Sequence, residues 1–96
     1  MAKMTGSNAD AAQMDHLQRA IEMSILPFRE NTEAILVVGA LLRVARILLR
    51  LYKPDLRLGF ISASVAYLQG KDTFEDPAQK STLESMGFYL PPGSRN

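Results

Sequence analysis

The chain has 96 residues, of which 47% are hydrophobic and 22% charged, with a formal net charge of +1 and no cysteine. This length favours one domain, and the composition is that of a folded chain. The near-neutral charge argues against a nucleic-acid-binding domain, and the lack of cysteine excludes disulfides, thiolate metal sites and a cysteine nucleophile.

Residues 1–6 form a polar tail, and the sequence that follows predicts a first helix at about 8–25. Ser7 and Asp10 are spaced as in a capping box, and Pro27 ends the helix because the residue before a proline disfavours helical geometry. The apolar residues recur at spacings of three and four, which is typical of one helix face. They are Met14, Leu17, Ile21 and Ile25.

A second helix is predicted at about 32–52. Asn31 is a favourable N-cap, and Glu33 lies in the first turn, where the helix dipole favours a negative charge. Pro54 follows the predicted end and prevents the helix from continuing.

A third helix is predicted at about 56–69, with Asp55 as its N-cap and Gly70 at its C-terminal cap. The alternation of larger and smaller residues between Ile61 and Tyr67 also fits a strand. We prefer the helix, because a single strand would have no partner elsewhere in the chain.

The fourth predicted helix is short, at about 77–86. Asp76 is placed as its N-cap, Pro77 at its first position and Gly87 at its C-cap. Residues 88–96 then form an extended tail whose apolar residues dock on the rest of the chain. The fold expected is all-α and occupies a single domain over 1–96: a hairpin of the second and third helices, the first helix packed across it, and the short fourth helix.

The second helix is apolar over most of its circumference. Its charge-free run, residues 34–42, is far shorter than the ~20 residues of a membrane span, so we expect none. The stripes offered by the other helices are too narrow to enclose it, so we expect self-association or a partner protein. A compact monomer with a central second helix is the alternative. The expected interface residues are Ile35, Val38, Leu42 and Leu49.

Basic residues line one edge of this helix, and the sequence between Glu33 and Asp55 contains no acid. Arginine can grip phosphate or carboxylate groups in pairs, which indicates an anion-binding stripe. The interpretation we prefer is the solvated edge of an otherwise apolar helix, because rows of charged residues usually mark the solvent-exposed side. The residues of this stripe are Arg43, Arg46, Arg50 and Lys53, extended by Arg57.

No catalytic or metal-binding constellation is evident. His16 is the only histidine and has no second ligand or nucleophile at a suitable spacing, and Asp72, Glu75 and Asp76 lack the pattern of a calcium loop. We therefore expect a non-enzymatic, cytoplasmic assembly or protein–protein interaction module without cofactor or metal. The second hypothesis is an oligomer that binds an anionic, nucleotide-like ligand through the arginine stripe.

Overall fold

The computed structural model describes residues 8–71 and 80–94, and every regular element within them is a helix. The elements are α1 (Asn8–Ile25), the single 3₁₀ turn η1 (Leu26–Phe28), α2 (Ala34–Leu49), α3 (Pro54–Leu68) and α4 (Thr82–Met86). The predicted all-α class is confirmed.

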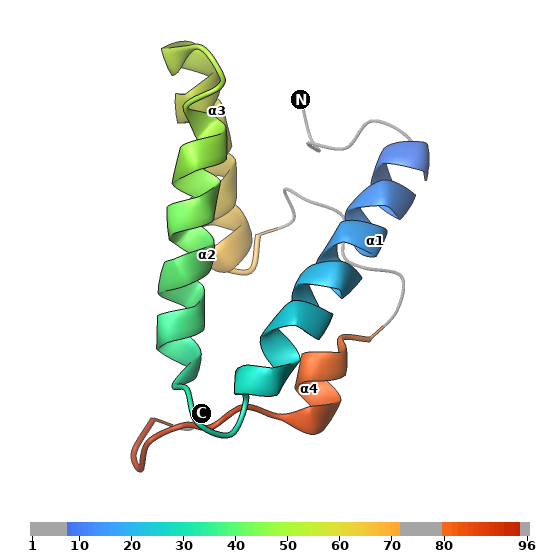
Figure 1. The fold of residues 1–96 in the computed structure, drawn as a ribbon. Coiled ribbons are helices and arrows are strands. Elements are labelled where there is room, and N and C mark those ends of the chain that lie inside the picture. The colour runs from blue at the N-terminus through green and yellow to red at the C-terminus, as the bar shows by residue number, and fades with distance from the viewer. Residues whose placement is uncertain (1–7, 72–79, 95–96) are drawn as a thin grey trace.

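The helices form two pairs (Figure 1). α2 and α3 run antiparallel and flank a common groove without close backbone packing, and α4 lies against the C-terminal half of α1. From their shared turn, α1 and α2 diverge like the arms of a V. The expected packing of the first helix across the hairpin is therefore wrong, since α1 packs chiefly against η1 and α4.

α1 has the predicted bounds, 8–25, and the chain then tightens into η1 around Pro27. The backbone amide of Arg29 and its Nη1 both donate to the Leu26 carbonyl oxygen, at 3.2 Å each. This closes the turn that the proline begins.

α2 is shorter than the predicted 32–52. Asn31 is not the N-cap of α2. The backbone amides of Asn31 and Thr32 both donate to the Phe28 carbonyl, which holds the two residues in the preceding turn. Glu33 takes the N-cap position, with extended backbone and no side-chain cap bond. At the other end, Leu51 and Tyr52 donate to carbonyls three residues back, so the helix tightens and ends at Leu49.

α3 begins earlier than the predicted residue 56, because Pro54 occupies its first turn and Lys53 is the N-cap. Asp55 lies in the first turn and is not the cap that the sequence suggested. The helix ends in a Schellman motif, in which Lys71 donates to Ala66 and Gly70 to Tyr67. Gly70, predicted at this end, has a φ of 87°, which glycine adopts without strain.

α4 is shorter than the predicted 77–86. Lys80 and Ser81 are not helical, Ser81 is the N-cap, and the helix ends at Gly87 as expected. The proposed cap Asp76 and Pro77 lie outside the described residues. Residues 88–90 lie beside the end of η1 in space. There the Tyr89 backbone amide donates to the Arg29 backbone carbonyl at 2.8 Å.

The described residues enclose no apolar core. None of their hydrophobic side chains is buried, and Glu22 is the one buried residue among them. The accessible surface is 7888 Å², whereas a compact monomer of 10.6 kDa exposes about 5,500 Å². The radius of gyration, 14.7 Å, also exceeds the ~12–13 Å of a compact domain of this length. The isolated chain thus exposes on the order of 2,000 Å² more than a compact monomer would.

Gly39 in α2 and Gly59 in α3 report whether other parts of the chain pack closely against these helices. A Cβ at either glycine would meet no atom within 4 Å. Replacing either with alanine should raise the free energy of unfolding by about 0.5–1 kcal/mol, because alanine loses less backbone entropy in a helix. Urea denaturation followed by circular dichroism measures this.

Gly87→Ala is the matched control, because its φ of 77° strains any residue with a Cβ. This variant should lose stability where Gly39→Ala gains it. Destabilisation by Gly39→Ala would instead show that another backbone packs on this position.

Candidate functional site

α2 consists of apolar residues apart from Arg43 and Arg46, and none of its residues is buried. Of the interface residues expected from the sequence, Ile35 is 65% exposed and Leu42 58% exposed. Val38 is also exposed, whereas Leu49 is half-buried. Leu42 and Leu49 both line a groove against α3.

A second apolar face of α2 lies opposite this groove. Its residues within α2 recur at spacings of four, four and three, so they share one side of the helix, and Leu51 follows in the turn after the C-cap. All of them are exposed, and Leu51 reaches 80%. We call this face the outer stripe: Leu36, Ala40, Val44, Ile47 and Leu51. The sequence does not distinguish the outer stripe, because an almost entirely apolar helix gives no signal of which side faces its neighbour.

The groove between α2 and α3 has a volume of about 490 Å³. This lies within the range of small-molecule sites, which spans ~300–1,000 Å³. The described residues that line it are apolar or basic apart from Ser64. They are Leu42, Ala45, Arg46, Leu49 and Arg50 from α2 and its C-cap, and Arg57, Ile61, Ser64, Val65 and Leu68 from α3.

The structure brings together three of the five basic residues predicted as an anion site. Arg46, Arg50 and Arg57 line the groove, whereas Arg43 and Lys53 do not. Arg57 is half-buried, and its Nε donates to the Tyr52 carbonyl at 3.2 Å. That bond and the contact of the Tyr52 and Phe60 rings, 5.6 Å between centroids, order the turn between the two helices.

Arg46 and Arg50 are exposed, and neither guanidinium forms an ion pair or hydrogen bond with the described part of the chain. With Arg57 they place three positive charges in one groove. Among the described residues that line it, none is acidic. The groove therefore offers unneutralised guanidinium groups beside an apolar wall.

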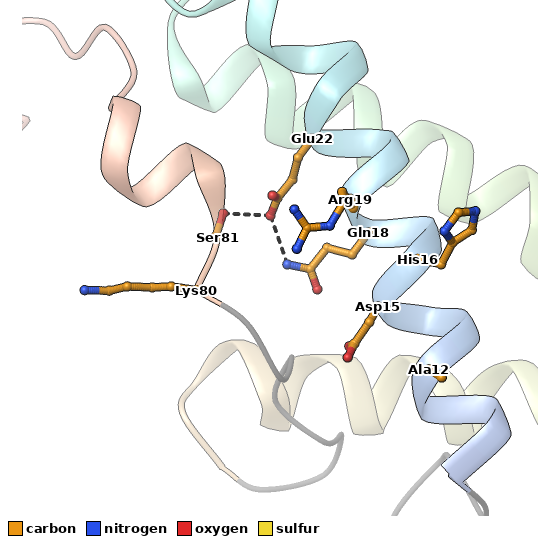
Figure 2. Close-up of a pocket in the computed structure, with 8 residues that line it drawn as sticks. All are labelled: Ala12, Asp15, His16, Gln18, Arg19, Glu22, Lys80 and Ser81. Atoms are coloured by element: carbon orange, nitrogen blue, oxygen red, sulfur yellow. Dashed lines mark hydrogen bonds between the residues drawn. The ribbon is translucent and has the colours of Figure 1, made fainter.

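A separate polar cluster joins α1 to α4 (Figure 2). The Glu22 carboxylate, only 8% exposed, accepts from Gln18 Nε2 at 2.9 Å and from Ser81 Oγ at 2.7 Å. It also accepts from the Thr82 amide at 3.3 Å. Ser81 Oγ in turn accepts from the Leu83 amide at 3.1 Å, so the same hydroxyl caps α4 and binds α1.

The sequence analysis missed this cluster, although Ser81 and Glu84 have capping-box spacing that marks the true start of α4. Hydrogen bonds from Gln18 and then from Ser81 lower the pKa of the Glu22 carboxyl below its ordinary 4.5, and burial acts in the opposite direction. The charged carboxylate is therefore the form that the fold prefers.

A pocket of about 240 Å³ lies beside this cluster, lined in part by Asp15, His16, Arg19 and Lys80. In Figure 2 the His16 ring and the Lys80 side chain both point away from the Glu22 carboxylate. Within residues 8–71 and 80–94, no group of three or more His, Asp or Glu side chains is placed to hold a metal ion. The cluster is therefore best explained as a structural joint.

None of the described helices has the length and hydrophobicity required to cross a membrane. Comparison of the chain with models of protein families, with curated proteins and with solved structures gives no match. Inference about function therefore depends on the groove and on the outer stripe.

Glu22 should make the docking of α4 sensitive to acid. A carboxyl whose pKa is lowered by folding stabilises the fold above its unfolded pKa, and this contribution is lost as the pH falls through the lower folded pKa. The free energy of unfolding should therefore fall as the pH drops below about 4.5. Glu22→Gln should weaken docking at neutral pH and remove this part of the pH dependence.

Amide hydrogen exchange at Thr82 and Leu83 reports the docking of α4 directly. The matched control is Glu30→Gln, because the Glu30 side chain is 85% exposed and its ion pair with Arg29 is long, at 3.9 Å. The control should retain the acid sensitivity of the unchanged protein. Equal pH profiles for the Glu22→Gln and Glu30→Gln proteins would exclude Glu22 as the group responsible.

Proposed function

We propose that the chain is a non-enzymatic assembly module whose copies associate through α2. The observation that supports this most directly is the outer stripe, whose five apolar residues are exposed in the isolated chain. Monomeric proteins rarely expose so large a contiguous apolar surface. A cytoplasmic location accords with this role and is part of the proposal.

The outer stripe offers a continuous apolar row for an interface. A standard interface buries about 800 Å² on each partner, and the exposed side chains of the stripe would form its apolar centre. A second copy is the simplest partner, because an uncharged apolar face is complementary to itself in a two-fold arrangement. Its residue spacing also suits the pairing of two helices along a seam.

Ile47→Glu tests the interface. Ile47 is 61% exposed in the isolated chain, so a charge there should leave the helices folded. In an assembly the same carboxylate would be buried without a partner, which costs several kcal/mol. We expect native mass spectrometry and sedimentation to show an oligomer for the unchanged protein and a hundredfold or greater loss of affinity for the variant, equivalent to about 2.7 kcal/mol.

Leu58→Glu is the matched control, since Leu58 is 66% exposed on α3 and lies outside both the outer stripe and the groove. This variant should associate as the unchanged protein does. Folded monomers at micromolar concentrations of the unchanged protein would refute self-association.

A second candidate function is the binding of an anionic small ligand. Three arginines in one groove, with no acid among its described lining residues, support this candidate. It is compatible with assembly, because the groove and the outer stripe lie on opposite sides of α2.

A further inference from the structure

We propose that the groove between α2 and α3 binds a single-chain anionic amphiphile, a medium-chain fatty carboxylate. This deepens the second candidate function, because it rests on anion binding in the groove and names the chemical class of the ligand. It departs from the nucleotide-like ligand that the sequence alone suggested.

The groove is polarised along its length. Because α2 and α3 are antiparallel, Arg50 and Arg57 meet near the hairpin turn and Arg46 lies one helical turn further along. The opposite end is formed by Leu42 and Leu68. With a rise of 1.5 Å per residue, the lining residues span about 12–16 Å of helix. One end is therefore cationic and the remainder is largely apolar.

A carboxylate head fits the cationic end. Arg46 and Arg50 retain their full sets of donors in the described part of the chain, and Arg57 still offers its terminal nitrogens although its Nε donates to Tyr52. Guanidinium–carboxylate bonds are charge-assisted and stronger than neutral hydrogen bonds. The head group would supply the negative charge that the groove lacks.

An alkyl chain fits the rest of the groove better than a nucleobase does. No described lining residue is aromatic, so a base would have no ring on which to stack. The hydroxyl of Ser64, the one uncharged polar side chain among the described residues of the lining, already donates to the Phe60 carbonyl at 2.7 Å. At the apolar end, formed by Leu42 and Leu68, a base would leave its polar edge without partners, which costs free energy, whereas methylene groups need none.

Calorimetric titration of the full chain with four probes tests this assignment. Decanoate has both head and chain, acetate has the head alone, decanol has the chain alone, and ATP represents nucleotides. We expect saturable binding of one decanoate per chain and affinities at least about tenfold lower for the other three, which corresponds to 1.4 kcal/mol or more. Tight ATP binding with no decanoate binding would refute the amphiphile and retain anion binding. No binding of decanoate or ATP would refute both.

Variants locate the site. Arg50→Gln should lower decanoate affinity about tenfold or more, whereas Arg43→Gln, which changes a neighbouring arginine outside the groove, should not. Ile61→Gln should weaken the binding of decanoate, because it replaces an apolar side chain of the groove lining with a polar one. Equal losses for Arg50→Gln and Arg43→Gln, or binding of many decanoate molecules without saturation, would refute the assignment and indicate adsorption to exposed apolar surface. Sedimentation of the same samples reports assembly independently.

Discussion

The hydrogen bonds that converge on the Glu22 carboxylate hold α1 against α4, while α1 and α2 diverge from their shared turn (Figure 1). The carboxylate receives donors from both helices, and Ser81 is shared between Glu22 and the first turn of α4. Such a bond network is specific in direction, whereas apolar contact is not. α1 packs chiefly against η1 and α4, and the apolar circumference of α2 stays open.

The helices themselves could be predicted because their signals are local. Pro27 and Pro54 mark where helical geometry fails, and Gly70 and Gly87 supply positive φ angles at two helix ends. These effects depend on residues within one turn of one another. For the same reason the bounds of α1 agree with the prediction over its whole length.

The caps that were predicted wrongly depend on groups outside the pattern that was considered. Asn31 is held in a turn by the Phe28 carbonyl, which no helix-capping rule takes into account. Ser81 begins α4 in partnership with Glu22, which lies 59 residues earlier in the chain. The local capping box of Ser81 and Glu84 marks the start of α4. Nothing in the sequence indicates which distant carboxylate will accept a hydrogen bond from the Ser81 hydroxyl. Long-range polar pairs of this kind leave no periodic signal.

The candidate site shows the same division between local and distant information. The basic row of α2 was visible from spacing, yet only contact with α3 separates Arg46 and Arg50, which line the groove, from Arg43, which does not. The interface residues presented a harder problem. In a helix that is apolar on every side, the spacing of apolar residues does not indicate which side faces a neighbour. Ile35, Val38 and Leu42 could therefore be recognised as apolar surface in need of cover, but the outer stripe could not be distinguished from them.

The two proposed uses of α2 are coupled through charge. Association of two copies through the outer stripe brings two arginine rows into one assembly, and between Glu33 and Asp55 the sequence provides no acid to offset them. Exposed charges interact over about 8 Å at physiological ionic strength, so repulsion between the rows depends on how closely the copies approach. A carboxylate bound among Arg46, Arg50 and Arg57 removes part of that repulsion. Since binding linkage is reciprocal, an anion that favours assembly must also bind more tightly to the assembled form than to the single chain.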